Sequence, residues 1–252
     1  MMDLDLSGKN VLVTGSSRGI GLGILQSFLN QGCNVVANGR THDTLVSATK
    51  DLKNCFFISG DVTNELEAQR IVKESVDYLG SLDVVVCNVG NSKSVKAGDE
   101  DLNEWNKIIS DNFFSAVNII QSAKHALKLS KGSIICISSI CGHEIIEGAP
   151  LTYSVSKSAL NYYVKGVSRH LNELGVRINA VSPGNIMFKE SLWEKKIQNN
   201  EEEVKEMLKN NVPLKRFGTP DDIANLTLWL SSPLAKNVTG AVYISDGGQI
   251  RS

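Results

Sequence analysis

Two side chains four residues apart, Tyr153 and Lys157, carry the most distinctive chemistry in the sequence. Residues at this spacing lie one above the other on a helix. Apolar residues recur near the helical period over residues 152–174, and Gly175 stands where helices commonly end. Near a bound cationic nicotinamide, a Lys ammonium lowers the pKa of a neighbouring phenol, whose reference value is about 10. Such a phenol can exchange a proton with a carbonyl oxygen while hydride moves at the carbon.

Short apolar runs alternate with helix-like segments along the whole chain. Strands are predicted near residues 10–14, 35–37, 56–58, 82–87, 134–137, 176–181 and 242–244. These runs are apolar throughout, which indicates strands buried on both faces of a parallel sheet. The sequence therefore predicts an α/β fold in a single domain over residues 1–252: one doubly wound parallel sheet of the Rossmann type, with about seven strands and helices on both faces.

Capping signals mark several helix ends. Asn64 with Glu67 three residues later predicts a capping box, and Thr219-Pro220 predicts another helix start. A long helix is expected over residues 101–129, bent in its middle. The charged, irregular segment 187–212 is predicted to be a substrate lid with one short amphipathic helix around Val204, because ligands of such sheets bind beyond the carboxyl ends of the strands.

A glycine-rich stretch, Thr14 to Gly21, lies between the first predicted strand and the first helix. Its spacing is Gly-x-x-x-Gly-x-Gly. Glycines permit a tight turn and a close approach of the backbone, and the helix N-terminus offers N–H groups and a partial positive charge to a pyrophosphate. The position of the glycines therefore favours a dinucleotide site over an ordinary turn.

The end of the second strand bears on cofactor choice. NAD enzymes place an acid there to bind the ribose 2′-hydroxyl. This chain has Asn38-Gly39-Arg40-Thr41 instead. The guanidinium of Arg40 suits a phosphate, and Arg18 in the glycine turn can approach the same group. The sequence thus predicts NADP(H) as the cofactor.

Composition narrows the class of protein. A formal net charge of −1 and a pI near 6.4 argue against a nucleic-acid or membrane-surface partner. No apolar run approaches the roughly 18 residues of a membrane span, and no signal peptide is expected at the N-terminus. Five scattered cysteines are interpreted as buried thiols of a cytoplasmic protein, and four histidines without ligand spacing predict no metal site.

Taken together, these motifs resemble those of the short-chain dehydrogenase/reductase family over nearly the full length. The resemblance adds Asp61-Val62, Asn88-Val89-Gly90, Asn112, Ser139 and Pro183-Gly184 to the glycine turn and the Tyr153–Lys157 pair. It implies that Tyr153 is the general acid/base, that Ser139 hydrogen-bonds the substrate oxygen, and that Lys157 binds the nicotinamide ribose. Asn112 would hold a water of a proton relay. Asp61 and Val62 would flank the adenine, and Asn88 would lie along the cofactor. The cofactor-binding residues expected in all are Gly15, Ser17, Arg18, Gly19, Ile20, Gly21, Arg40, Asp61, Val62, Asn88, Gly90, Tyr153, Lys157, Pro183, Gly184 and Ile186.

Three departures from the family pattern stand out. Cys87 replaces an Asn before Asn88, which we interpret as a packing change. The interval from Ser139 to Tyr153 is one residue longer than is usual in the family, so Ser138 competes for the catalytic role. We prefer Ser139 because members of the family carry the catalytic serine three residues before a glycine, which here is Gly142. Phe188 replaces a Thr that often contacts the nicotinamide amide, and it is either a lid residue or core packing of the lid.

The expected activity is an NADP(H)-dependent interconversion of a carbonyl and a secondary alcohol, run as a reductase. Residues 213–224 and Asp246-Gly247-Gly248 resemble 3-oxoacyl-carrier-protein reductases, so a 3-oxoacyl thioester or similar ketone is expected. The polar lid suits a sugar or nucleotide-sugar substrate equally well, and a non-catalytic NADP-binding protein is a further alternative. By resemblance, the chain is expected to form a homo-tetramer or homo-dimer.

Overall fold

The centre of the computed structural model, which describes residues 3–251, is a parallel sheet of seven strands. The strands are β1 (Asn10–Val13), β2 (Asn34–Gly39), β3 (Cys55–Ser59), β4 (Val84–Cys87), β5 (Ser133–Ile137), β6 (Arg177–Pro183) and β7 (Val242–Ser245). They lie in the order β3-β2-β1-β4-β5-β6-β7, and every neighbouring pair is parallel. The strand order reverses between β1 and β4, where sheets of this kind open a ligand crevice. The predicted doubly wound sheet is confirmed.

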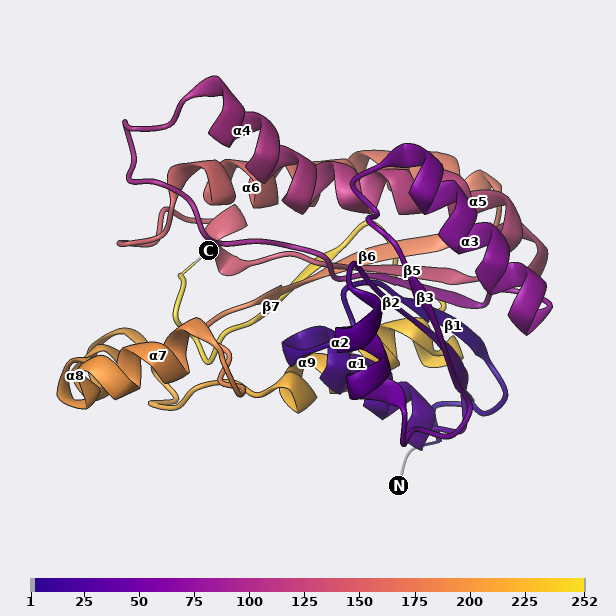
Figure 1. Ribbon diagram of the computed structural model, residues 1–252, viewed down its shortest axis with the longest axis horizontal. Coiled ribbons are helices and arrows are strands. Elements are labelled where there is room, and N and C mark those ends of the chain that lie inside the picture. Colours follow the sequence, from indigo (N-terminus) through magenta and orange to yellow (C-terminus); the bar gives the residue numbers. More distant parts are fainter. Residues whose placement is uncertain (1–2, 252) are drawn as a thin grey trace.

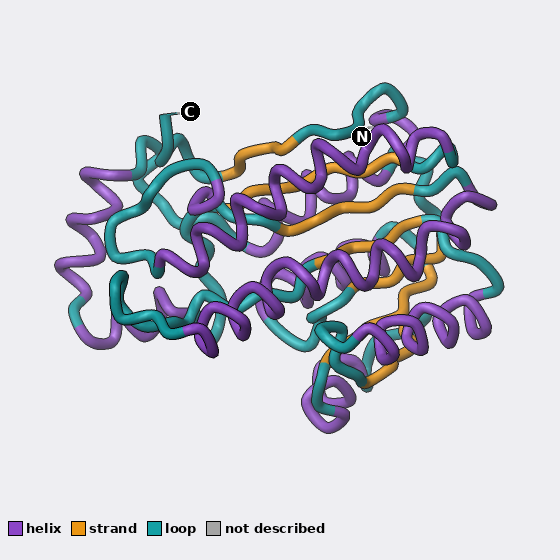
Figure 2. The backbone as a smooth tube through the Cα atoms, turned by 90° about the horizontal axis from the view of Figure 1, so that it is seen from above, coloured by secondary structure: helices purple, strands orange, loops and turns teal. Residues whose placement is uncertain are grey.

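Helices cover both faces of the sheet. They are α1 (Gly19–Asn30), α2 (His42–Thr49), α3 (Glu65–Leu79), α4 (Leu102–Ile109), α5 (Ser115–Ser130), α6 (Leu151–Glu173), α7 (Leu192–Asn199), α8 (Glu201–Asn211) and α9 (Pro220–Ser231). In Figure 1, α3, α5 and α6 lie above the sheet, and α1, α2 and α9 lie below it. Figure 2 shows the three upper helices side by side across the strands, with α7 and α8 projecting at one end.

The apolar strands explain this layered arrangement. Successive side chains of a strand point to opposite faces. In β1, Leu12 packs into the cluster under α3, α5 and α6, whereas Val11 and Val13 pack into the cluster over α1 and α9. All three side chains are fully buried. Burial of one such side chain stabilises the fold by about 1.5–3 kcal/mol, so an alternating apolar-polar strand could not occupy this position.

Three local predictions need correction. The helix expected over residues 101–129 is interrupted by a π-helical turn, Ser110–Phe114, which separates α4 from α5. Segment 187–212 contains two helices, α7 and α8, instead of one. Only half of the capping box at Asn64 forms: its side chain accepts the Glu67 N–H, but the Glu67 carboxylate pairs with Arg70. The box at Thr219 is complete.

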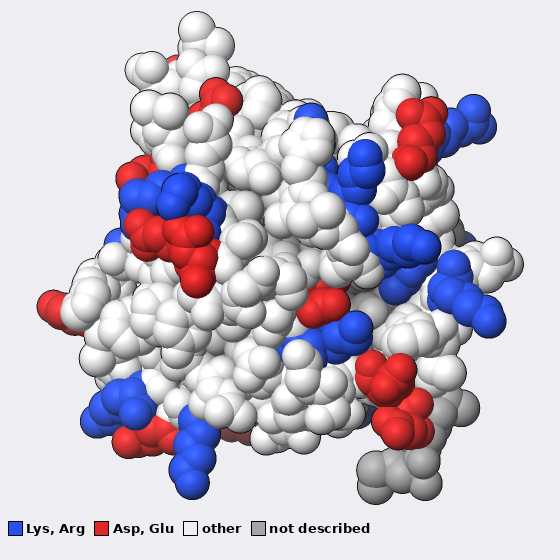
Figure 3. Space-filling model, turned by 90° about the vertical axis from the view of Figure 1, so that its right-hand side faces the viewer, with Lys and Arg blue, Asp and Glu red and all other residues white. Residues whose placement is uncertain are grey.

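Charged side chains are spread over the surface. On the face shown in Figure 3, acidic and basic groups lie interspersed, as expected for a nearly balanced formal charge. None of the helices within residues 3–251 is both long enough and apolar enough to cross a membrane.

Candidate active site

Tyr153 and Lys157 lie on successive turns of α6, near its N-terminus. Lys157 is 3% exposed, and its ammonium donates a hydrogen bond to the carbonyl of Ile137 at 2.9 Å. The same ammonium lies 5.9 Å from the centre of the Tyr153 ring. Because Ile137 ends β5, the sheet itself orients the lysine towards the tyrosine.

Burial shifts the pKa of each group in the direction that favours its neutral form. It raises the pKa of Tyr153 to about 12, and the Ser139 hydroxyl opposes this rise by hydrogen bonding. It lowers the pKa of Lys157 to about 8. The expected lowering of the Tyr153 pKa by Lys157 assumes a cationic nicotinamide beside the pair. Among the protein's own groups, burial has the largest effect on the Tyr153 pKa and Lys157 is not among the groups that shift it, so at neutral pH the phenol is protonated and can act as an acid.

The two candidate serines differ in what their hydroxyls contact. The Ser139 oxygen accepts a hydrogen bond from the Cys141 N–H at 3.1 Å and is the hydrogen-bond partner of the Tyr153 phenol. The Ser138 hydroxyl donates to the backbone carbonyl of Lys157 at 3.4 Å. Ser138 also lines the cleft described below. These contacts tie Ser138 to the helix backbone and favour Ser139 as the partner of Tyr153.

Asn112 is fully buried within the π-helical turn. Its amide donates to the carbonyls of Ile108 and Asn91, at 3.0 and 2.9 Å, and its oxygen accepts the Asn91 N–H at 2.9 Å. A methyl group added at Gly90 would lie 2.9 Å from the Asn112 oxygen and 3.1 Å from the Lys157 nitrogen. Asn112 therefore anchors the loop after β4 close to Lys157.

The glycine turn after β1 forms one wall of a cleft of about 340 Å³. Gly15 and Gly19 have φ values of 62° and 56°, in the left-handed region. A methyl group at Gly21 would lie 2.3 Å from the Gly15 carbonyl oxygen and 2.4 Å from the side-chain nitrogen of Asn88. No side chain caps the N-terminus of α1, and no acid lies in its first turn. The bare backbone and the uncapped helix end fit a pyrophosphate.

Most of the predicted cofactor residues meet at this cleft. Those that line it are Gly15, Ser17, Arg18, Gly19, Ile20, Gly21, Arg40, Asp61, Val62, Asn88, Gly90, Tyr153 and Lys157. Pro183, Gly184 and Ile186 are not among its lining residues. Gly184 donates its N–H to the Ser245 carbonyl, and Ile186 lines a second hollow with Gly218. Asn112 and Ser139 do not line the cleft themselves but contact residues that do.

The expected cofactor-binding set left out several residues that line the cleft. Asn38, Gly39 and Val89 belong to segments that the sequence had singled out, whereas no sequence argument pointed to Gly60, Asn91, Ser92 and Ile137. Each of them ends a strand or lies within five residues of a strand end. The rule that ligands bind beyond the carboxyl ends of parallel strands could have found them.

The two arginines predicted to bind a phosphate both reach the cleft. Arg18 and Arg40 both line it, and both are exposed. A methyl group at Gly39 would make only ordinary contacts, the nearest at 3.4 Å to Leu45, so the absence of an acid there is not imposed by space. Asp61 is the acid among the lining residues, and one of its oxygens accepts both the N–H and the hydroxyl of Thr63.

Phe188 precedes the lid helices and contacts the glycine turn. A methyl group at Gly19 would lie 2.8 Å from the Phe188 ring, and Phe188 also lines the cleft. It therefore covers the cleft at the N-terminus of α1. Further along, Trp193 of α7 packs on Phe217, with 5.3 Å between the ring centres.

Metal-ligating side chains do not gather anywhere in the described chain. Within residues 3–251, no cluster of three or more His, Cys, Asp or Glu side chains could hold a metal ion. The groups assembled at the cleft are a phenol, an ammonium, hydroxyls and guanidinium groups. They suit proton transfer and phosphate binding.

Known proteins resemble this chain over its whole length. A family model described as enoyl-(acyl carrier protein) reductase matches residues 15–249. Glucose 1-dehydrogenase 2 of Bacillus subtilis is 30% identical, over 97% of this chain and 95% of that protein. A 3-oxoacyl-[acyl-carrier-protein] reductase of Staphylococcus aureus is 32% identical, over 95% of this chain and 97% of that protein.

One solved structure gives the same result for the fold. L-sorbose reductase from Gluconobacter frateurii, complexed with NADPH and L-sorbose, matches with a TM-score of 0.93 and 26% identity, covering 100% of both chains. Together with the family model and the relatives, this match shows that the chain belongs to the short-chain dehydrogenase/reductase family, whose enzymes act on CH–OH and C=O groups.

Proposed function

We propose that this protein is an NADP(H)-dependent reductase that converts a ketone, such as a 3-oxoacyl thioester, into a secondary alcohol. The observation that carries the proposal is the layout of the cleft. The Tyr153–Lys157 pair lies on its wall, with Ser139 at the Tyr153 phenol, and Arg18 and Arg40 line it without an acid at the end of β2.

The cofactor is assigned from the groups that would hold it. The uncapped N-terminus of α1 would bind the pyrophosphate. The Arg40 fork, with Arg18, would bind a 2′-phosphate. The assignment rests first on the charge pattern of this chain, and the NADPH complex of the Gluconobacter frateurii L-sorbose reductase supports it.

The catalytic roles follow from contacts and pKa values. A reduced nicotinamide, when bound in the cleft, would supply the hydride for the carbonyl carbon. The Tyr153 phenol, protonated at neutral pH, donates its proton to the substrate oxygen, which the Ser139 hydroxyl also hydrogen-bonds. Lys157, with a pKa of about 8, is mostly cationic at pH 7 and favours the phenolate that forms. Asn112 keeps the loop after β4 next to Lys157.

A sugar or nucleotide-sugar substrate is the second candidate. The segment between β6 and α8 is polar: Lys189, Glu190 and Lys195 are exposed, and the Lys196 ammonium lies 4.7 Å from the centre of the Trp193 ring. Such groups can hydrogen-bond hydroxyls. The names of the B. subtilis glucose dehydrogenase and the sorbose reductase support this candidate, whereas the S. aureus reductase supports an acyl thioester.

Assembly and compartment remain part of the proposal. Phe114, Val155 and Tyr162 are 47%, 41% and 81% exposed on the outer surface of α6 and the adjoining π-helical turn. Covering them in a homo-dimer or homo-tetramer would remove apolar surface from water. The cysteines of the described residues are all free thiols, as in a reducing compartment, and we propose the cytoplasm.

A substrate screen tests the proposed activity. The purified protein is offered NADPH with acyl thioesters, keto sugars and small ketones, and loss of NADPH absorbance is followed. We expect turnover of at least one class, absent from the Tyr153→Phe variant. If the protein binds NADPH and reduces none of these carbonyls faster than Tyr153→Phe does, the proposed reductase function is wrong.

A further inference from the structure

The segment of residues 58–63, which comprises the end of β3 and the turn after it, is held by side chains from three separate elements. We call it the β3 turn. Its backbone carbonyls accept hydrogen bonds as follows: Ile58 and Gly60 from the Asn38 amide at 3.0 and 3.2 Å, Ser59 from the Arg70 guanidinium at 2.7 Å, and Val62 and Thr63 from the Asn118 amide, both at 3.1 Å. Turns are ordinarily fixed by their own residues, so this degree of external bonding calls for an explanation.

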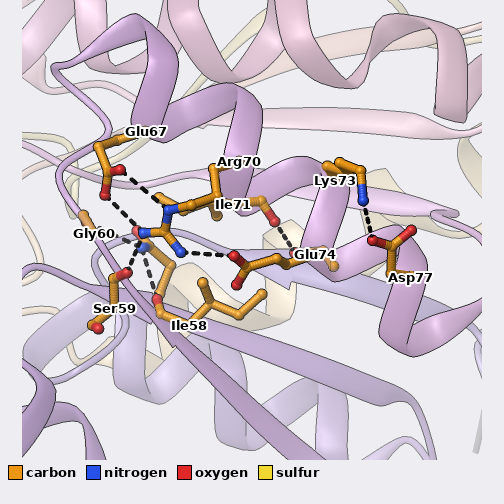
Figure 4. Close-up of polar contacts among 11 residues, drawn as sticks. Ile58, Ser59, Gly60, Glu67, Arg70, Ile71, Lys73, Glu74 and Asp77 are labelled. Carbon is orange, nitrogen blue, oxygen red and sulfur yellow. Dashed lines mark hydrogen bonds and ion pairs between the residues drawn. The ribbon is translucent and has the colours of Figure 1, made fainter.

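Arg70 is itself fixed from both sides, as Figure 4 shows. Its guanidinium binds Glu67 through two nitrogens, at 3.1 and 2.7 Å, and Glu74 through a third contact at 3.0 Å. Hydrogen bonding to these carboxylates raises the pKa of Arg70. The paired acids hold the guanidinium in one orientation, so the remaining donor points steadily at the Ser59 carbonyl.

Gly60 makes room for this contact. A methyl group at Gly60 would lie 2.7 Å from the Arg70 nitrogen that binds Ser59, and 2.8 Å from a Glu67 oxygen. Any larger residue would displace the guanidinium or the turn. The glycine and the arginine therefore form one unit, although they are ten residues apart.

The β3 turn lies at the cofactor cleft. Gly60, Asp61 and Val62 line the cleft together with Asn38. The Gly60 N–H also donates to the Gly39 carbonyl, which connects the turn to the strand end that carries Arg40. Asn38 is 1% exposed, and its amide oxygen has no protein partner.

We propose that Arg70, together with Asn38 and Asn118, is a positioning residue for cofactor binding: it presets the β3 turn so that Asp61 and Val62 meet the adenosine half of the dinucleotide. Arg70 lies outside the cleft lining and acts only through the Ser59 carbonyl. The inference rests on the proposed function, because it requires a nicotinamide dinucleotide as ligand. It goes further by making adenosine recognition depend on a surface arginine of α3.

Loss of this contact has a specific signature. A turn that must be ordered during binding lowers affinity for every ligand that contains adenosine, whereas hydride transfer from a fully bound cofactor is unaffected. We expect Arg70→Met to weaken NADPH and NADH by the same factor, roughly 5- to 30-fold. Removal of Arg40 would instead weaken NADPH more than NADH, because Arg40 acts on the 2′-phosphate that only NADPH carries.

Calorimetric dissociation constants test the proposal, with NADPH, NADH, adenosine 2′,5′-bisphosphate and reduced nicotinamide mononucleotide as probes. The matched control is Lys73→Met, which removes the 2.6 Å Lys73–Asp77 pair on the same helix without touching the turn. For Arg70→Met we expect weaker binding of the three adenosine ligands, unchanged binding of the mononucleotide, and faster amide hydrogen exchange in residues 58–63. The control should match wild type.

Two further variants keep the test independent of folding defects. Gly60→Ala keeps Arg70 but fills the space that its guanidinium occupies, and Arg70→Lys keeps the positive charge without the planar guanidinium. Both variants should lose affinity for the adenosine ligands and keep it for the mononucleotide. The inference is overturned if folded Arg70→Met binds the adenosine ligands as tightly as wild type does, or if it loses the same affinity for the mononucleotide. Neither result affects the proposed function as long as wild type binds NADPH. If wild type binds neither NADPH nor NADH, the proposed function fails first, and the inference fails with it.

Discussion

Lys157 is buried with its charge only partly compensated, and this makes stability depend on pH. Its pKa is about 8 in the folded chain and 10.5 ordinarily. Between these values the unfolded chain binds a proton that the folded chain does not, so the free energy of unfolding rises with pH. Above pH 10 the rise is opposed by Tyr153, whose pKa goes from 10.0 to about 12, because the unfolded chain then loses a proton that the folded chain keeps.

We therefore expect wild type without cofactor to gain stability relative to Lys157→Met from about pH 8 to about pH 10. Urea unfolding of both proteins across this range measures the difference, and titrations common to the two proteins cancel. A difference that stays flat with pH would show that Lys157 titrates normally in the folded chain.

At the level of single residues, the proposed preference for NADP(H) depends most on Arg40. A hydrogen bond to a charged group contributes about 1.5–3 kcal/mol, so Arg40→Ala should weaken NADPH by roughly 10- to 150-fold and leave NADH nearly unchanged. Gly39→Asp should go further, because its side chain has space and its carboxylate repels the phosphate while accepting the 2′-hydroxyl. Dissociation constants of both cofactors are the measurement. Equal weakening by Arg40→Ala, or a wild-type preference for NADH, would contradict the NADP(H) assignment.

At the scale of elements, the π-helical turn is the main unforeseen feature. Periodicity predicts one helix over residues 101–129, and a bend was expected without a cause. The π-helical turn contains Asn112, whose side-chain amide donates to the Asn91 carbonyl and accepts the Asn91 N–H. Such a contact joins residues that are 21 apart in sequence, so no local pattern encodes it. The pairing of Glu67 with Arg70 is different, because the two residues are only three apart on α3 and this local ion pair competes with the capping box for the Glu67 carboxylate.

Replacing Asn112 tests the role of this turn. Asn112→Ala leaves the buried partners of its amide without hydrogen bonds, which should lower the free energy of unfolding by about 2–4 kcal/mol and lower kcat as the loop beside Lys157 loosens. Asn106→Ala on the exposed side of α4 is the control and should change stability by less than about 0.5 kcal/mol. Thermal and urea unfolding give the comparison. If Asn112→Ala is as stable and as active as the control, the π-helical turn does not hold the loop beside Lys157.

The whole molecule was predictable from sequence to a greater degree than its details. Runs such as Val84–Cys87 are apolar on both sides, and only a sheet covered on both faces can bury them. Strand order and the cleft at the β1–β4 reversal follow from that class of fold. Contacts made by tertiary packing did not follow, including Phe188 on Gly19 and the placement of Ile186 in a second hollow.

Self-association is the prediction at this scale. Val155 and Tyr162 lie seven residues apart on one stripe of α6, so a partner subunit could cover both. Sedimentation analysis should show a dimer or tetramer for wild type and a smaller species for the Val155→Glu/Tyr162→Glu double variant. Leu129→Glu, at a position near the end of α5 that is 88% exposed, should keep the wild-type mass. A monomeric wild type would refute the proposed assembly.

Carbonyl reduction by this protein requires a proton, which we propose Tyr153 supplies, and one paired measurement tests this role. Tyr153→Phe keeps the ring and removes the hydroxyl, so kcat for NADPH-dependent reduction should fall by about 10²- to 10⁴-fold. The NADPH dissociation constant, measured on the same samples, should stay within about twofold of wild type because the cleft wall is otherwise unchanged. Retention of most of the activity by Tyr153→Phe, with NADPH still bound, would contradict the account.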